Sequence, residues 1–133
     1  RTLYELETGN TVEEIGFATN KRTCKFGGAS PDGLVGLDGL VEIKCLNDVK
    51  HFKLMIQKRK DNEFTIESKH EWQMQQQMLF TKRKWVDYVV YNPNFTDSLL
   101  VQRVSLDKEK QKKLKEGLKL GEEIINSIIK TLE

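Results

Sequence analysis

The chain is poor in cysteine. Cys24 and Cys45 are its only two cysteines, and neither belongs to a CxxC or Cys/His cluster of the kind that holds zinc or an iron–sulfur cluster. The sequence therefore predicts free thiols in a reducing cytosol and excludes a metal centre built on cysteine.

Long apolar runs are also missing, and no segment approaches the roughly eighteen apolar residues that a membrane-spanning helix needs. A hydrophobic content of 38% and a charged content of 32% are typical of a globular protein, so we expect no membrane partner. The chain begins with Arg1 and shows no charged leader followed by an apolar stretch, which predicts a truncated or processed chain. Its 133 residues suffice for one domain, residues 1–133.

The excess of positive charge is small. A net charge of +2 does not by itself predict a nucleic-acid partner, because basic residues form such a surface only where they cluster. Basic clusters do occur, within residues 50–60, at 82–84 and within 108–115. Solvated helix faces and turns remain an alternative interpretation of each cluster.

Apolar periodicity and turn residues predict the order of elements. Helices are expected at residues 1–7, 48–57, 68–80 and from 108 onward, and strands at 33–37, 40–45, 86–91 and 99–104. Residues up to Phe26 are expected to form a loop with one edge strand, and residues 58–62 a turn. Gly9 is the expected helix stop, while Ser68 and Asp107 are the expected N-caps. The order predicts an α/β fold with a central mixed β-sheet flanked by helices, the last helix packing one face on the sheet.

The most informative segment joins Pro31-Asp32 to Glu42-Ile43-Lys44. Leu37-Asp38-Gly39 between two apolar runs predicts a hairpin, which would return the Asp32 carboxylate to the side of Glu42. Because side chains alternate along a strand, Glu42 and Lys44 share one face and Ile43 points to the opposite, buried face.

Two carboxylates beside an ammonium group suit a hard cation. Mg²⁺ is held by a few carboxylate oxygens together with water and phosphate oxygens, and such an ion promotes phosphodiester hydrolysis. Lys44 would then position water or neutralise developing negative charge. The alternative is an ordinary hairpin in which Glu42 and Lys44 form an exposed pair and Asp32 caps a turn.

Two motifs connect this segment to a known family. Ser30-Pro31-Asp32-Gly33-Leu34 and Glu42-Ile43-Lys44-Cys45 resemble the core of the PD-(D/E)xK nucleases, and specifically the phage lambda-type exonucleases, or YqaJ-like viral recombinases. The resemblance covers about residues 1–105, and it extends to the segments 1–5, 73–75, 81–84 and 91–93.

The resemblance implies a restriction-endonuclease-like core and a role for each matching residue. Asp32 and Glu42 would be metal ligands, with the backbone carbonyl of Ile43 completing the inner shell. Lys44 would be the catalytic lysine, and Gln73 would assist near the water or the scissile phosphate. The expected DNA contacts are Ser30, Gln75, Lys82, Arg83 and Lys84. For Gln75 the polar face of an amphipathic helix is an equal alternative. We expect Trp72 and Trp85 to pack in the core or on the sheet rather than to stack on bases, and His51 and His70 to lie at the surface or an interface.

The activity implied by the resemblance is Mg²⁺-dependent hydrolysis of duplex DNA from the 5′ end, with Mn²⁺ as a substitute metal. It also implies a homo-oligomer, for example a ring-shaped trimer. The expected partner is a single-strand annealing protein, and the expected setting is the host cytoplasm, where a phage or prophage encodes the protein. The family places a further metal-site glutamate before the segment matching Arg1, so we expect an N-terminally truncated nuclease domain. A structure-specific or restriction-type endonuclease and a non-catalytic DNA-binding fragment remain alternatives. Nucleases that hold an iron–sulfur cluster with four cysteines are disfavoured, because the chain has only two cysteines.

Overall fold

The computed structural model describes residues 1–20 and 22–133, which form a mixed α/β fold. The helices are α1 (Thr2–Thr8), α2 (Asp48–Asp61), α3 (Ser68–Thr81) and α4 (Lys108–Leu132). The strands are β1 (Val12–Glu13), β2 (Ala18–Asn20), β3 (Cys24–Ala29), β4 (Gly33–Val35), β5 (Gly39–Lys44), β6 (Trp85–Tyr91) and β7 (Leu99–Ser105). None of the helices in this part of the chain combines the length and apolarity that crossing a membrane requires.

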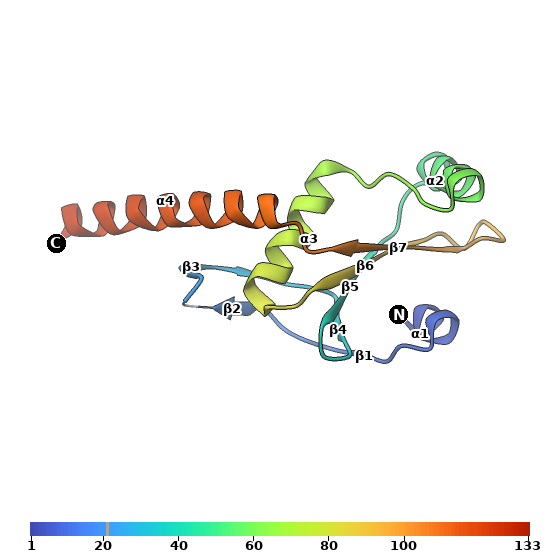
Figure 1. The fold of residues 1–133 in the computed structure, drawn as a ribbon, viewed down its shortest axis with the longest axis horizontal. Coiled ribbons are helices and arrows are strands. Elements are labelled where there is room, and N and C mark those ends of the chain that lie inside the picture. Colours follow the sequence, from blue (N-terminus) through green and yellow to red (C-terminus); the bar gives the residue numbers. More distant parts are fainter. Residues whose placement is uncertain (21) are drawn as a thin grey trace.

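Five strands form the central sheet in the order β1-β4-β5-β6-β7 (Figure 1). Only β5 and β6 are parallel, and the chain between them passes through α2 and α3. The other neighbours in this sheet pair antiparallel, while β2 and β3 form a separate two-stranded sheet. The prediction of a central mixed sheet flanked by helices is confirmed.

Alternation along β5 and β6 gives the sheet two buried faces. On one face, Leu40 packs with Val86 and with Met74 and Met78 of α3. On the other face, Val41 packs with Tyr4 of α1. The face under α3 is the face that carries Glu42 and Lys44, so α3 is the helix that closes over the predicted site.

The β4–β5 hairpin forms as predicted, but its turn differs from the expected one. The positive backbone dihedral falls at Gly36 (φ +57°), whereas Gly39 is already the first residue of β5 and pairs with both Val35 and Trp85. A Cβ at Gly39 would stand 2.2 Å from the Trp85 ring. Gly39 is therefore required for close packing and not for the turn.

Helix ends differ from prediction in two places. Residues 58–61 continue α2 instead of forming a turn, and the helix ends at Asn62 in the left-handed region (φ 62°). The ammonium of Lys58 donates to the Val101 carbonyl at 2.7 Å, which gives this charged turn of helix a fixed partner. Helix α3 begins after Glu67 without a side-chain cap, so Ser68 is not its N-cap.

The N-terminal region contains more strand than predicted. Instead of a loop with one edge strand, it forms β1 at the edge of the main sheet and the β2–β3 hairpin. The pairing that creates β1 is with β4, a partner more than twenty residues away, so no local pattern marks it.

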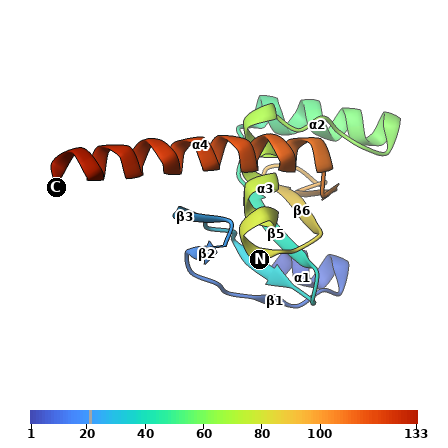
Figure 2. The same ribbon diagram turned by 60° about the vertical axis from the view of Figure 1, so that its left-hand side comes forward.

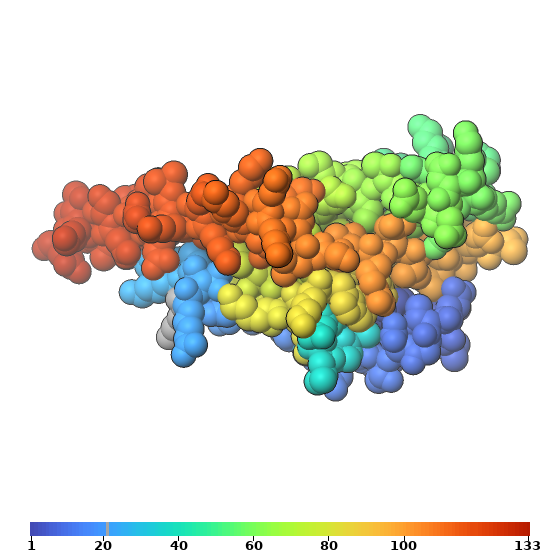
Figure 3. Space-filling model, in the orientation of Figure 1, coloured from blue at the N-terminus to red at the C-terminus, as the bar shows by residue number. Residues whose placement is uncertain are grey.

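Helix α4 begins as predicted, with the Asp107 carboxylate accepting from the backbone nitrogens of Glu109 and Lys110. It does not pack on the central sheet. Its first half lies against α3 and β3, where Leu118 packs beside Cys24 and Phe80, and its second half extends past the β2–β3 hairpin (Figures 2 and 3). Ile124, Ile125, Ile128, Ile129 and Leu132 in that half are exposed.

The histidines and tryptophans have structural contacts. His51 is wholly buried, contrary to prediction, and its Nε2 lies 2.8 Å from the Asp97 carbonyl. His70 is partly buried, with its Nδ1 2.8 Å from the Tyr88 hydroxyl. Trp85 packs under the Arg103 guanidinium, 3.6 Å from the ring centroid, as expected for a tryptophan that packs on the sheet.

Candidate active site

The β4–β5 hairpin brings the two predicted carboxylates together. Gly33 pairs with Val41 in antiparallel register, so Asp32, just before β4, lies opposite Glu42. Asp32 is exposed, and its Oδ2 accepts a hydrogen bond from the backbone nitrogen of Ile43 at 2.7 Å. The β5 backbone thereby holds the Asp32 carboxylate next to Glu42.

Glu42 is the centre of a hydrogen-bonded group. Its Oε1 lies 3.1 Å from the Lys44 ammonium and 3.4 Å from the amide nitrogen of Gln73. The Gln73 amide oxygen accepts from Lys44 at 3.3 Å, which closes a three-membered ring of contacts. Glu42, Lys44 and Gln73 therefore meet as the sequence motifs predicted, although they come from β5 and α3.

Glu42 is buried, whereas Asp32 is exposed. Glu42 is only 4% exposed, which contradicts the alternative of an exposed Glu42–Lys44 pair on an ordinary hairpin. A buried carboxylate is costly unless its oxygens are paired, and here α3 supplies the partners. The ring of donors holds the negative charge of Glu42 at one position between β5 and α3.

Gln77 is the residue that the sequence analysis missed. Its amide nitrogen donates to Glu42 Oε2 at 2.8 Å, and both side chains are buried. Gln77 follows Gln73 by four residues and so lies one turn further along the same helix face. That spacing was a usable signal that Gln77 shares a helix face with Gln73, although Gln73 is exposed and only Gln77 is buried. The spacing does not identify Glu42 as the partner.

Gln75 was predicted as a DNA contact, and its burial excludes that role here. It is 2% exposed, and its side chain donates to the Ser105 carbonyl and accepts from the Asp107 nitrogen, both at 3.0 Å. Gln111 of α4 also donates to it at 3.0 Å. Gln75 ties the start of α4 to α3, a buried structural role that differs from the polar helix face expected as the alternative.

A hollow of about 540 Å³ opens beside the site. Ser30 is exposed at its edge, Gln73 and Gln77 form the wall nearest Glu42, and Lys69 lies on its rim. The amide of Gln76 donates to the Gly28 carbonyl at 2.9 Å and joins α3 to β3 along this wall. Asp32, Glu42 and Lys44 do not line the hollow, which adjoins the site only through Gln73 and Gln77.

The predicted DNA contacts Lys82, Arg83 and Lys84 are not near this site. They follow the C-terminal end of α3 and precede β6, whose first residue pairs with Gly39 at the start of β5. Arg83 donates to the Gly36 and Gly39 carbonyls at 2.7 and 3.2 Å, so its guanidinium supports the hairpin turn. The structure separates this cluster from Lys44 by the length of β5.

Burial also affects two ionisable groups next to the site. Tyr88 pairs with Glu42 across β5 and β6, and burial, with smaller effects from the charges of Glu67 and Glu42, raises its pKa to about 12. Burial lowers the pKa of His70 below its usual value, and the positive charge of Lys44 lowers it further. Both groups are therefore neutral near pH 7.

The donor set of the site fits a hard divalent cation. Asp32 and Glu42 supply carboxylate oxygens, and Mg²⁺ is commonly bound through one or two carboxylates with water and phosphate oxygens completing its shell. Among residues 1–20 and 22–133, no group of three or more His, Cys, Asp or Glu side chains forms a larger metal cluster. The described residues thus fit a cation site that leaves most coordination positions to water and substrate.

A five-stranded mixed sheet with Asp32 and Glu42-Ile43-Lys44 facing each other across a hairpin defines the PD-(D/E)xK class of fold. The model of the YqaJ-like viral recombinase domain matches residues 1–84. The chain belongs to this family, and the resemblance stated from its motifs is confirmed.

Solved structures agree with this assignment. The alkaline exonuclease LHK-Exo from Laribacter hongkongensis is 32% identical to this chain, and in complex with dAMP it superimposes with a TM-score of 0.75, over 100% of this chain and 69% of that one. A second LHK-Exo structure gives a TM-score of 0.69 over 100% and 70% of the two chains. A phage-related exonuclease from Haemophilus somnus, 14% identical, shares the fold with a TM-score of 0.63 over 99% of this chain and 68% of that one. A comparison with curated protein sequences gives no significant match.

Proposed function

We propose that this chain is the nuclease domain of a phage-type exonuclease that hydrolyses DNA phosphodiester bonds with Mg²⁺. The observation that carries the proposal is the meeting of Asp32 with the Glu42–Lys44–Gln73 group across the β4–β5 hairpin. The chain that carries these residues is 32% identical to an alkaline exonuclease, which supports a role for Asp32, Glu42, Lys44 and Gln73 in DNA cleavage.

Asp32, Glu42 and the Ile43 carbonyl would hold the metal, with Mn²⁺ able to replace Mg²⁺. The bound ion would supply Lewis-acid stabilisation of the negative charge that develops on the phosphodiester. The fit rests on the oxygen donors described above, which are of the kind that Mg²⁺ prefers.

The protein's own groups have distinct tasks in this proposal. The backbone nitrogen of Ile43 holds Asp32, while Gln73 and Gln77 hold the two oxygens of Glu42. Lys44 is bonded to Glu42 and yet retains 25% of its side-chain exposure, so its ammonium can also reach a phosphate oxygen or water. Such preorganised charge is an effective means of stabilising a transition state.

Strand polarity and assembly are further parts of the proposal, and the family resemblance is their only support. We propose cleavage from the 5′ end of duplex DNA, a homo-oligomer such as a ring-shaped trimer, and cooperation with a single-strand annealing protein. The expected setting is the cytoplasm of a phage-infected or lysogenic host.

The test is digestion of an end-labelled linear duplex with Mg²⁺, with Ca²⁺ and with EDTA. We expect cleavage with Mg²⁺, and little with Ca²⁺ because its looser coordination orients water poorly. Asp32→Ala, Glu42→Ala and Lys44→Ala should each lower the rate about a hundredfold or more. The control Asp38→Ala removes an exposed carboxylate from the same hairpin and should leave the rate unchanged.

Cleavage that survives any one of the three substitutions would remove that residue from the mechanism. A covalently closed circular duplex provides the second comparison, because an exonuclease spares it and an endonuclease with the same metal core opens it. If the closed circle is digested as fast as the linear duplex, the activity is that of an endonuclease and the exonuclease proposal is wrong.

A non-catalytic DNA-binding domain is the second candidate function. It is favoured by the small donor set, since the described residues form no acidic cluster of three or more, and by the burial of Glu42. DNA binding without Mg²⁺-dependent cleavage in the digestion experiment would establish this reading.

A further inference from the structure

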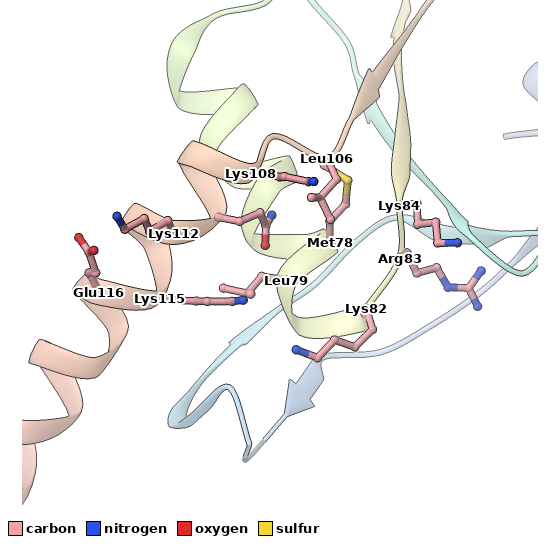
Figure 4. Close-up of a pocket in the computed structure, with 11 residues that line it drawn as sticks. Met78, Leu79, Lys82, Arg83, Lys84, Leu106, Lys108, Lys112, Lys115 and Glu116 are labelled. Atoms are coloured by element: carbon pink, nitrogen blue, oxygen red, sulfur yellow. The ribbon is translucent and has the colours of Figure 1, made fainter.

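Two basic clusters that are separate in the sequence line one hollow in the structure. The hollow has a volume of about 580 Å³, and its floor is apolar, formed by Met78, Leu79 and Leu106 (Figure 4). Its basic side chains come from two walls, Lys82, Arg83 and Lys84 on one and Lys108, Lys112 and Lys115 on the other. We call this hollow the basic groove.

Helix geometry and a buried polar contact create the groove. Lys108, Lys112 and Lys115 are spaced by four and three residues, so they lie on one face of α4. Gln111 on the same part of α4 donates to the Gln75 carbonyl of α3 at 2.7 Å. This contact holds the α4 lysines opposite the residues that follow α3, and Figure 4 shows Lys108 and Lys115 reaching toward Met78 and Leu79.

The groove concentrates positive charge. Its lining holds six cationic side chains and the single carboxylate of Glu116, although the whole chain carries a net charge of only +2. Two of the six have partners at the β4–β5 turn, since Lys84 lies 3.9 Å from Asp38 and Arg83 donates to the Gly36 and Gly39 carbonyls. The positive charge that faces the hollow is therefore mainly that of Lys82, Lys108, Lys112 and Lys115. Within the part of the chain that the structure describes, Lys108, Lys112 and Lys115 form no ion pair, and Lys82 bonds only to the Thr23 hydroxyl. Like charges on one helix face repel one another, and positive charges near the helix N-terminus interact unfavourably with the helix dipole. A bound polyanion would relieve both effects.

The basic groove is separate from the candidate active site. Lys44 and Gly39 stand at opposite ends of β5, roughly 16 Å apart at strand spacing, and the Lys82 cluster adjoins the Gly39 end. Along α3, Gln73 and Lys82 are nine positions apart, or roughly 13 Å. A ligand in the groove therefore lies beyond the reach of Asp32 and Glu42.

We propose that the basic groove binds the sugar–phosphate backbone of DNA at a distance from the bond that is cut. The proposal rests on the proposed nuclease function and adds a second contact surface to it. The lysines of α4 favour DNA over a compact acidic peptide, because the basic face continues past the hollow to Lys119 and spans roughly 16 Å from Lys108. A linear array of this kind matches a polymer with regularly spaced charges.

The test is binding of a fluorescein-labelled 30-base-pair duplex, followed by anisotropy in EDTA over a series of salt concentrations. The groove variant replaces Lys108, Lys112 and Lys115 by Gln, and the control variant replaces Lys53, Lys60 and Lys130 by Gln, with the same change in charge at exposed positions elsewhere. Gln is a good helix former, and thermal melting followed by circular dichroism checks the fold. Lys82→Gln with Lys84→Gln, on the opposite wall, gives an independent second variant.

We expect the groove variant to weaken binding to unrelated duplex sequences equally, and to reduce the slope of log K against log salt by about 2–3. The control should keep the wild-type slope. Equal losses in both variants, no loss in either groove variant, or binding of the wild type that is independent of salt would each overturn the proposal.

Competition and cleavage separate the remaining possibilities. Polyglutamate and unlabelled duplex are compared as competitors at equal concentrations of negative charge. If polyglutamate displaces the labelled duplex more effectively, the ligand of the groove is an acidic peptide and not DNA. The proposed nuclease function is tested in the same preparations by Mg²⁺-dependent digestion. Wild-type cleavage with unchanged binding by the groove variants would contradict the groove alone, whereas groove-dependent binding without cleavage would contradict the nuclease proposal alone.

Discussion

Glu42 faces two requirements at once. A metal ligand needs an ionised carboxylate that a cation can reach, whereas α3 covers this side chain almost completely. Gln73, Gln77 and Lys44 resolve the conflict, because they donate to both carboxylate oxygens and thereby offset the cost of burying a charge.

Gln77 gives the sharpest prediction at the scale of single residues. Replacing Gln77 by Leu should lower the rate of DNA cleavage by about ten- to a hundredfold, because groups that orient metal ligands commonly have effects of that size. Digestion rates at saturating Mg²⁺ measure the effect. The control Gln57→Leu removes an amide that bonds Thr65 on another part of the fold and should not change the rate. An unchanged rate for Gln77→Leu in a folded protein would reduce Gln77 to a packing residue.

The apolar stripe of helix α4 is partly buried in the first half of the helix and exposed in the second half. Leu114, Leu118, Ile125, Ile128 and Leu132 follow helical spacing throughout. Leu114 and Leu118 are partly buried, with Leu118 packed beside Cys24 and Phe80, whereas the other three are exposed. The helix is longer than the surface that α3 and β3 offer, so the end of its apolar stripe is exposed in this structure.

The exposure of that stripe predicts a difference in stability. Ile128 is 55% exposed, so Ile128→Ala should change the free energy of unfolding by less than about 0.5 kcal/mol. Leu100 is 3% exposed in the core under α2 and α3, and Leu100→Ala should cost about 2–5 kcal/mol. Urea denaturation of the two variants provides the comparison. A large cost at Ile128 would show that the end of α4 is buried in solution.

The lowered pKa of His70 predicts that the stability of the whole molecule depends on pH. The folded protein holds the pKa of His70 below the usual value through burial and the nearby Lys44 charge, so below about pH 6.5 the unfolded chain binds a proton more readily than the folded one. This contribution to stability is therefore present above that pH and lost as pH falls through the lowered pKa.

We accordingly expect the melting temperature to fall between pH 7.5 and pH 5.5, and to fall less in His70→Gln. The control Lys60→Gln changes an exposed residue of α2 whose charge is not among those that act on His70, and it should keep the wild-type dependence. If His70→Gln and the wild type lose stability equally on acidification, another group is responsible.

Much of this protein could be predicted from local sequence. The β4–β5 hairpin, the spacing of Asp32, Glu42 and Lys44, and the Asp107 cap of α4 were predicted correctly, because alternation and capping act within a few residues. The position of the hairpin turn was not, since the positive dihedral falls at Gly36 and not at Gly39. The motif spacing also sufficed for the family, since residues on one hairpin keep their relation whatever packs around them.

Only the tertiary structure decided which distant groups meet. Gln77 reaches Glu42 and Gln75 holds α4 because α3 crosses the sheet face at one position, and a glutamine shows no local sign of which partner it will meet. The lysines at 82–84 and 108–115 share one groove for the same reason, since the direction of α4 is set by its contact with α3 and β3. Each of these outcomes depends on long-range packing, which local periodicity and capping do not encode.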